Sequence, residues 1–299
     1  MTDLIEPLMV PPGSTVRLSR DHDPGYTGQV PRQQAAGLLA DGVDLLAEYQ
    51  DRLAAQDTYG MLLVLQGLDA SGKDSTIKHI FSGVNPQGCA VHSFKQPTYS
   101  ELEHDFLWRH VIALPERGHV GIFNRSYYEE CLVTRVHPDL LAKERLPPEL
   151  VTRNIWRERF EDICAFERYL RRSGTVVLKF FLNISREEQR QRFLERLDDP
   201  AKVWKFSMAD IAERALWPRY MAAYQDVVRH TSTEIAPWYV VPADHKWFAR
   251  VVIGSAIVSA LDALNLRFPR AKASLEEFKR LREALLAEGK RPAVKKAKP

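Results

Sequence analysis

The chain has 299 residues, 45% of them hydrophobic and 27% charged, which is the composition of an ordinary soluble globular protein. It contains no apolar run near the roughly 20 residues that span a bilayer, and its start, MTDLIEPLMVPPG, lacks the basic stretch and apolar core of a signal peptide. We therefore expect a cytoplasmic protein that does not enter a membrane. Cys89, Cys131 and Cys164 have no spacing suited to zinc, so we expect buried, reduced thiols.

The net charge of +3 is unevenly distributed along the chain. Residues 288–299 contain one acid, Glu288, and five basic residues that give this end of the chain a charge of +4: Lys290, Arg291, Lys295, Lys296 and Lys298. Residues 1–287 therefore sum to −1, whereas a protein that binds nucleic acid usually has a basic domain. We expect no nucleic-acid binding, and a disordered basic tail over 288–299.

The predicted elements alternate between helices and strands. Residues 1–34 contain five prolines and no clear period, which predicts an extended N-terminal arm. A helix is predicted from about residue 34 to 55, at the start of a single domain that runs from 35 to 287. Apolar runs then predict buried strands, with helical stretches between them, at 61–66, 89–94, 120–123, 175–182 and 236–241. This order favours an α/β fold with a five-stranded parallel sheet and helices on both faces.

Two later helices have clear boundaries in the sequence. The longest predicted helix begins at Pro147 and Pro148, because proline is tolerated in a first turn, and it ends at Gly174. A final amphipathic helix is predicted near 274–287. No internal repeat is visible, which favours one domain.

Residues 61–76, MLLVLQGLDASGKDST, contain two glycines five residues apart and a lysine directly after the second. A predicted strand precedes this glycine loop, residues 67–73, and a helical pattern follows it. Glycines let several backbone N–H groups point at one phosphate, the helix N-terminus adds its positive end, and the lysine reaches the transferred group. We therefore predict phosphate contacts from Gly67, Ala70, Ser71, Gly72, Lys73, Asp74 and Ser75.

Two carboxylates make this loop unusual. The loop lysine is normally followed by Ser or Thr, whose hydroxyl binds Mg²⁺, but here Asp74 takes that position. Asp69 lies inside the loop and is a candidate ligand of Mg²⁺, which prefers one or two carboxylates together with phosphate oxygens. The alternative is that Asp69 is a turn residue bonded to its own backbone.

The strand predicted at 120–123 is followed by NRSYYEE, residues 124–130, which we call the strand-end motif. Doubly wound sheets bind ligands at the C-terminal ends of their strands. Phosphoryl transfer needs a residue there to hold metal or water, and an arginine to offset developing charge. Asn124 and Arg125 are therefore predicted catalytic residues, and Glu129 and Glu130 are candidate metal ligands. The alternative is a helix start, where acidic side chains are favoured.

A charged helix is predicted within residues 184–215, which we call the lid segment. Arg192 and Arg196 are four residues apart and so share one helical face, where they are predicted to clamp phosphates when the lid closes. Lys202 and Lys205 extend this predicted phosphate site. The alternative is a solvated helix with surface salt bridges.

Residues 94–109, FKQPTYSELEHDFLWR, combine basic, acidic and aromatic side chains on a predicted helix. Such a mixture suits stacking of a purine and binding of its phosphates. Together with Glu129, the predicted nucleotide ligands are Lys95, His104, Asp105, Trp108 and Arg109. The alternative places Trp108 in the core.

Five motifs follow one another along the chain: GLDASGKDSTI, FKQPT, HDFLWR, FNRSYYEE and RLDDPAKVWKFS. Together they resemble the polyphosphate kinase 2 family over roughly residues 35–265. The resemblance implies a P-loop kinase fold like that of thymidylate kinase, with a helical lid. It also implies Mg²⁺-dependent transfer of phosphate between inorganic polyphosphate and adenine nucleotides, with Mn²⁺ as a second candidate metal and guanine as a second candidate base. A homo-oligomer, either a dimer or a tetramer, is expected.

The same resemblance assigns roles to individual residues. It implies that Lys73 and the loop amides hold phosphates, and that Asp69 is a metal ligand and a catalytic residue. It also implies that Arg125 contacts phosphate and that Arg192 and Arg196 belong to the lid.

The strand-end motif departs from much of that family, which has aspartate before Arg-Ser. Here Asn124 stands in that position and Glu129 and Glu130 follow, a variant that resembles the subgroup acting on both nucleoside mono- and diphosphates. Two other functions fit the loop and the fold: an ATP-dependent nucleoside monophosphate kinase of thymidylate kinase type, and a non-enzymatic protein that binds nucleotide or polyphosphate. The RLDDPAKVWKFS segment favours the polyphosphate-dependent kinase.

Overall fold

The computed structural model describes residues 2–288, except for the side chains of Thr2 and Lys205. Residues up to Arg267 form one compact unit, and residues from Phe268 onward form a second one. The second unit contains the amphipathic helix α14 (Leu275–Glu288), whose leucines are exposed. Beyond Glu288, the predicted basic tail lies outside the described residues. Within residues 2–288, no helix combines the length and the apolar character needed to cross a bilayer.

The described part of the chain contains a six-stranded sheet in the order β1-β6-β5-β2-β4-β3. Its strands are β1 (Met9–Val10), β2 (Gly60–Gln66), β3 (Cys89–Ser93), β4 (Val120–Asn124), β5 (Thr175–Asn183) and β6 (Trp238–Pro242). Strands β2 to β6 are parallel, at the five places that the apolar runs predict. The five-stranded sheet is nevertheless wrong, because β1 adds a sixth strand antiparallel to β6.

The missed strand β1 is too short to leave a pattern in the sequence. Met9 pairs with Tyr239 and Val10 with Trp238, and Pro11 then ends the pairing because proline lacks the N–H that a ladder needs. A strand of two residues is too short to show the alternation of apolar and polar side chains that predicts a strand. Because β1 is antiparallel and the other strands are parallel, the sheet is mixed.

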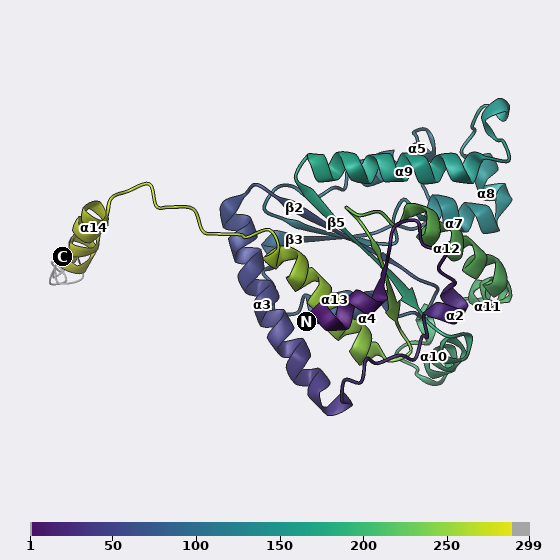
Figure 1. Cartoon of the computed structure of the whole chain (residues 1–299), viewed down its shortest axis with the longest axis horizontal. Helices are drawn as coiled ribbons and strands as arrows, with labels where there is room; N and C mark the ends of the chain where they lie inside the picture. Colours follow the sequence, from purple (N-terminus) through teal and green to yellow (C-terminus); the bar gives the residue numbers. More distant parts are fainter. Residues whose placement is uncertain (1, 289–299) are drawn as a thin grey trace, which may run out of the picture. The chain divides into compact units, whose positions relative to one another are not determined.

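Helices cover both faces of this sheet (Figure 1). The α-helices of the first unit are α1 (Thr2–Ile5), α2 (Leu18–Asp21), α3 (Ala35–Gln56), α4 (Lys73–Ile80), α5 (Tyr99–Leu102), α6 (Trp108–Val111), α7 (Glu129–Val136), α8 (Pro138–Lys143), α9 (Ile155–Arg172), α10 (Arg186–Asp198), α11 (Met208–Ala215), α12 (Trp217–Thr231) and α13 (Lys246–Asp262). Single turns of 3-10 helix lie at Glu6–Leu8, Arg32–Gln34, Pro86–Gly88, Pro148–Leu150 and Val203–Lys205.

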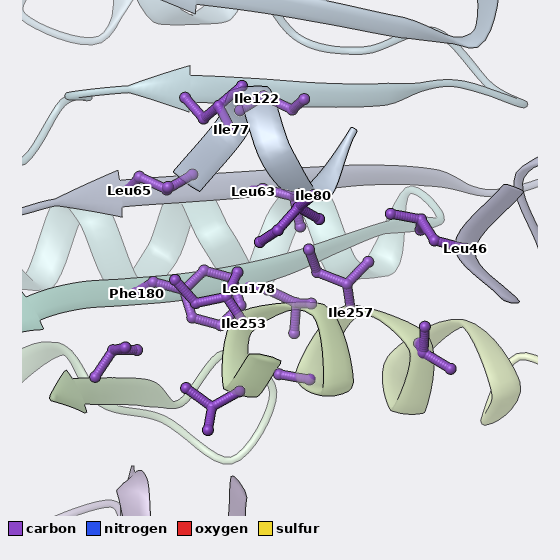
Figure 2. Packing of buried hydrophobic residues seen from close by; sticks show 14 of the residues in the cluster. Leu46, Leu63, Leu65, Ile77, Ile80, Ile122, Leu178, Phe180, Ile253 and Ile257 are labelled. Carbon is purple, nitrogen blue, oxygen red and sulfur yellow. The ribbon is translucent and has the colours of Figure 1, made fainter. Parts of the chain in front are cut away.

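Each face of the sheet has its own hydrophobic core. Side chains of α3, α4 and α13 pack on one face, and those of α7, α9 and α12 on the other. Figure 2 shows the first core, where Ile77 of α4 and Ile253 of α13 lie against strand residues such as Leu63 and Leu178. Burying each such side chain stabilises the fold by about 1.5–3 kcal/mol. These two cores fix α4 and α7, the helices that begin at the glycine loop and in the strand-end motif.

The residues predicted as an extended arm supply side chains to both cores. Ile5 and Leu8 pack in the first core, and Val10, Val16 and Leu18 in the second. Short helices and β1 interrupt the arm, and its extended stretches lie between them.

Two predicted helices differ from the structure. The helix expected from Pro147 begins at Ile155, because the prolines form a separate 3-10 turn, and at 18 residues it is shorter than α3 with 22. The single helix expected within 94–109 is two short helices, α5 and α6. Thr98 caps α5 through a capping box, and the side chain of Asp105 accepts a hydrogen bond from the backbone N–H of Leu107, which favours a turn between them.

Candidate active site

The glycine loop joins the C-terminal end of β2 to the first residue of α4, as the sequence predicts. Gly67 and Gly72 have φ angles of +158° and +105°, and Ala70 has +62°. At Gly67 a Cβ atom would lie 2.7 Å from Ser71 Oγ and 3.0 Å from the carbonyl oxygen of Leu182. A larger residue would therefore displace the loop, and glycine is required there for both conformation and space.

Lys73 folds back over the loop that precedes it. Its ammonium donates to the carbonyl oxygens of Gly67 at 2.6 Å and Leu68 at 3.2 Å, and the residue is only 8% exposed. Burial, together with the nearby charge of Arg125, lowers the pKa of Lys73 to about 8. A phosphate bound at the loop would favour the charged form of Lys73 and so raise its pKa again.

We expect the apparent second-order rate constant, kcat/KM, to fall as the pH rises above about 8. The free protein then loses the Lys73 proton and with it the cation that attracts phosphate, whereas below this pKa the lysine is charged and the rate constant is independent of this group. The turnover number, kcat, should change less, because bound phosphate keeps the lysine protonated. Initial rates between pH 6 and 10 measure both constants, and Lys73→Ala should lack this decline. A flat profile up to pH 10 would contradict the assignment.

Arg125 connects the strand-end motif to the glycine loop. Register pairs Leu65 of β2 with Asn124 of β4, so the loop and the motif start side by side, and the backbone N–H of Arg125 donates to Leu65 O at 3.0 Å. Its guanidinium contacts the carboxylates of Asp69 at 3.0 Å and Glu129 at 3.4 Å. These two carboxylates, Glu129 first, raise the pKa of Arg125 further above its ordinary value. Three predicted site residues are thus brought together around one cation.

Asn124 contacts the residue that replaces the usual hydroxyl after the loop lysine. Its side-chain amide donates to Asp74 Oδ1 at 2.6 Å. An aspartate at 124 would place two carboxylates at this distance, and the asparagine instead supplies a hydrogen-bond donor to Asp74.

Glu130 points to a different partner from Glu129. Its carboxylate pairs with Arg109 at 3.0 Å, both side chains are buried, and burial raises the pKa of Glu130 to about 7. Arg109 also donates to the carbonyl oxygen of Lys95 at 2.8 Å. The structure therefore brings Lys95, Arg109 and Glu130 together, next to the Asp69–Arg125–Glu129 cluster.

Two cavities share Arg125 and Glu129 as part of their walls. The first, of about 280 Å³, lies between Gly67–Asp69 of the glycine loop and helices α7, α8, α10, α11 and α12. The second, of about 210 Å³, lies between residues 94–97 after β3, Arg109 of α6 and helices α7 and α8. The part of the wall that both cavities share therefore contains the guanidinium of Arg125 paired with the carboxylate of Glu129.

Arg192 holds the glycine loop from outside. It is 4% exposed, and its guanidinium donates to the carbonyl oxygens of Ala70, Ser71, Ala243 and Asp244 at 2.6–3.0 Å. Gln189 on the same face of α10 donates to the carbonyl oxygen of Asp69 at 2.9 Å. These contacts occupy carbonyl oxygens of the loop and not the N–H groups that bind phosphate. The geometry gives Arg192 a supporting position instead of the open lid face that its spacing suggested.

We expect Arg192→Ala to lower the free energy of unfolding by about 3 kcal/mol, because it leaves buried carbonyl oxygens without a charged donor. It should also raise the KM for both substrates, since both depend on the loop. Arg190→Ala is the matched control on the same helix: this arginine is exposed and pairs with Glu187, so a change within about 0.5 kcal/mol is expected. Urea unfolding curves measure both values. Equal stabilities of the two variants would show that the carbonyl contacts are unimportant.

The other predicted residues lie in several places. Arg196 is half-buried over the ring of Phe193, and Lys202 is exposed and pairs with Asp199. Neither lines the two cavities, and the side chain of Lys205 lies outside the described residues. His104, Asp105 and Trp108 do not line these two cavities either. The rings of His104 and Trp108 stack on each other, with their centroids 4.0 Å apart. Their predicted substrate contacts stay predictions.

The first cavity contains polar residues that the sequence analysis missed. Glu213 accepts from Tyr220 Oη at 2.6 Å and lies 3.0 Å from His137 Nε2, and all three line the cavity. Burial raises the pKa of Tyr220, so its hydroxyl keeps its proton. His137 lies between α7 and α8, whereas Glu213 and Tyr220 belong to the consecutive helices α11 and α12. Only tertiary contacts bring His137 to the other two, so no local motif links the three.

The carboxylates near Arg125 meet part of what a divalent cation requires. Among residues 2–288, no three His, Cys, Asp or Glu side chains are arranged to hold a metal on their own. Asp69 and Glu129 both contact one guanidinium and therefore lie close together, whereas Glu130 is held by Arg109. One or two carboxylates completed by phosphate oxygens are what Mg²⁺ prefers. The residues present fit Mg²⁺ that arrives with phosphate.

Comparison with known proteins gives one consistent result. The family model of polyphosphate kinase 2 (PPK2) matches residues 32–269. The ADP-polyphosphate phosphotransferase of Rhodopseudomonas palustris is 47% identical over 251 residues, which cover 83% of this chain and 87% of the relative. The AMP/ADP-polyphosphate phosphotransferase of Meiothermus ruber is 44% identical, over 83% of this chain and 88% of the relative. The crystal structure of polyphosphate kinase 2 from Arthrobacter aurescens superposes with a TM-score of 0.85 at 39% identity, covering 95% of this chain and 96% of that one.

Proposed function

This chain belongs to the polyphosphate kinase 2 family, and we propose that it transfers a phosphoryl group reversibly between inorganic polyphosphate and AMP or ADP. The names of its relatives support this activity. The proposal includes a thymidylate-kinase-like P-loop fold whose lid segment closes over the substrates. A cytoplasmic dimer or tetramer that does not bind nucleic acid, with adenine as the first candidate base and guanine as the second, belongs to the same proposal.

The observation that carries the proposal is the wall that the two cavities share. A phosphoryl group that moves in line between two phosphates needs them to meet at a preorganised cation, with little covalent chemistry from the protein. Arg125 lies in that wall and contacts Asp69 of the glycine loop. Direct transfer between one substrate in each cavity needs no covalent phosphoenzyme.

The residues of this chain bind the phosphate groups, orient them and neutralise their charge. The loop amides and Lys73 bind phosphate oxygens, and Arg125 stabilises charge that develops during transfer. Arg192 and Gln189 keep the loop in its binding conformation through its carbonyl oxygens. Arg196, Lys202 and Lys205 extend phosphate binding when the lid closes.

We assign Asp69 and Glu129 as the carboxylates that would hold Mg²⁺, or Mn²⁺ in its place, together with phosphate oxygens. The bound cation would neutralise phosphate charge between donor and acceptor. Glu130 is buried against Arg109 and does not line the first cavity, as Asp69 and Glu129 do, so it is the weaker of the predicted metal ligands.

One assay separates this function from its alternatives. Purified protein, Mg²⁺ and long-chain polyphosphate are mixed with AMP or ADP, without ATP, and the nucleotides are followed by chromatography. We expect ADP and ATP to appear. Phosphorylation of AMP only when ATP is supplied would favour the nucleoside monophosphate kinase, and binding without product in both mixtures would favour the non-enzymatic protein.

The acceptor range gives a further prediction. We expect AMP to yield ADP first and ATP later in one tube, because Asn124, Glu129 and Glu130 resemble the subgroup that accepts both nucleotides. The shorter acceptor leaves a gap that a cation or its waters must bridge, and a glutamate beside Arg125 is placed to hold it. Glu129→Gln should lower AMP phosphorylation about tenfold more than ADP phosphorylation, since one hydrogen bond to a charged group contributes about 1.5 kcal/mol or more. Glu130→Gln tests the neighbouring glutamate in the same way.

Initial rates with each acceptor measure the difference. A wild-type protein that converts ADP but leaves AMP untouched would overturn the acceptor range and leave the polyphosphate-dependent activity intact.

A further inference from the structure

A buried polar network lies behind the strand-end motif. Lys179 of β5 and Glu167 of α9 form an ion pair of 2.6 Å, and neither side chain is exposed to solvent. The remaining Lys179 protons go to the carbonyl oxygen of Thr231 at 2.6 Å and the hydroxyl of Tyr128 at 3.1 Å. All three protons of the ammonium therefore have acceptors.

Tyr127 and Tyr128 converge on one oxygen of this network. Their hydroxyls donate to Glu167 Oε1 at 2.9 and 2.8 Å, while Glu167 Oε2 accepts from Lys179. Burial, and then the charge of Glu167, raises the pKa of both phenols well above the usual value, so both keep the protons that they donate. Consecutive helical side chains diverge by about 100°, so this convergence requires the turn that precedes α7.

The two tyrosines lie two and three residues after Arg125, whose backbone is strained. Arg125 has a φ of +64°, a conformation that costs a residue with a side chain about 1–3 kcal/mol. The backbone N–H of Arg125 donates to Leu65 O, which fixes the start of the turn. After Arg125 the chain passes through Ser126 to Tyr127 and Tyr128, whose hydroxyls are held by Glu167. In this conformation its guanidinium reaches Asp69.

We propose that Glu167 is a positioning residue: through the hydroxyls of Tyr127 and Tyr128 it holds the strand-end motif in the turn that directs Arg125 at the glycine loop. An ion pair is not needed for stability at such a place, because well-packed apolar residues of similar volume are often equally stabilising. An apolar pair in place of Glu167 and Lys179 would offer no hydrogen-bond acceptor to the hydroxyls of Tyr127 and Tyr128. The kinetic part of this inference rests on the proposed function.

Two double variants separate the acceptor from the ion pair. Glu167→Leu with Lys179→Met removes both the charges and the acceptor, whereas Glu167→Gln with Lys179→Met removes the charges and keeps an amide oxygen for the phenols. We expect the leucine variant to lose about 10- to 100-fold in kcat with KM changed less than about threefold, since small misplacements at a reacting centre cost this much. The glutamine variant should stay within about threefold of the wild type. Urea unfolding should give a lower midpoint for the leucine variant, because its two buried phenols have lost their acceptor.

A readout that needs no activity completes the test. Hydrogen–deuterium exchange of the peptide covering residues 124–130 should be faster in the leucine variant than in the glutamine variant. If the leucine variant folds poorly, Tyr127→Phe with Tyr128→Phe removes the same two hydrogen bonds from the other side and should show the same loss of kcat and faster exchange.

Equal exchange and equal kcat across these variants would overturn the positioning role. An inactive wild type would count against the proposed function, and the exchange comparison would still decide whether Glu167 holds the turn.

Discussion

Replacing Lys73 with alanine should lower kcat at least about 100-fold while leaving the fold intact, because removal of one preorganised charge stabiliser typically costs this much. The ammonium sits at the start of α4, with carbonyl oxygens of Gly67 and Leu68 as its partners in the absence of phosphate. Alanine removes the charge and keeps the helical backbone. The KM for the phosphate donor should rise as well.

Lys78→Ala is the matched control for this variant. Lys78 lies on the same helix, on its exposed side, so the change removes the same charge from the protein without touching the loop. Circular dichroism and initial rates are measured for both variants. Near-normal turnover in Lys73→Ala, with unchanged circular dichroism, would show that the glycine loop is not the site of transfer.

Asp69→Asn should also lower kcat at least about 100-fold. Asparagine has nearly the same shape and can still accept a hydrogen bond from Arg125, so the loop should keep its conformation. What is lost is the negative charge that a cation such as Mg²⁺ would need at this position. The dependence of the rate on Mg²⁺ concentration should therefore move to higher concentrations.

The control for Asp69 is a carboxylate in a comparable environment. Asp226 is 33% exposed and pairs with Arg135 at 2.6 Å, while Asp69 is 37% exposed and pairs with Arg125 at 3.0 Å. Asp226→Asn should leave the rate and its Mg²⁺ dependence unchanged. Equal effects of the two substitutions would remove Asp69 from the catalytic residues.

The parts of the site that the sequence predicts are those built from contiguous residues. Residues 61–80 contain an apolar run and two glycines at a characteristic spacing, and these patterns predict a strand, the glycine loop and a helix. The structure contains all three. Arg125 follows directly after a buried strand, and parallel strands end at one edge of the sheet. Short-range patterns therefore placed it beside Asp69.

The parts that the sequence does not predict depend on tertiary contacts. An exposed and a buried arginine look alike in a charged helix, so the sequence predicts a phosphate clamp at Arg192 and does not show that its guanidinium contacts carbonyl oxygens of the glycine loop. One signal in the sequence could have shown that Arg192 is buried. It shares one helical face with Gln189 and Phe193, at the spacing i, i+3 and i+4, and this face of α10 is the buried one. The helix expected within 94–109 failed because Thr98 and Asp105 favour caps and turns over helix interiors.

The pairing of β1 with β6 has a consequence for how the chain reaches its native state. Val10 and Trp238 lie near opposite ends of the first unit's sequence, so the first strand to be synthesised must wait for the last before it can pair. At a translation rate of about 5–20 residues per second, that interval lasts on the order of ten seconds or more. Until then Val10 has no strand to pair with, and the free edge of β6, once formed, is open to other chains. Docking of the N-terminal segment is thus a late step that covers this edge at Trp238 and Tyr239.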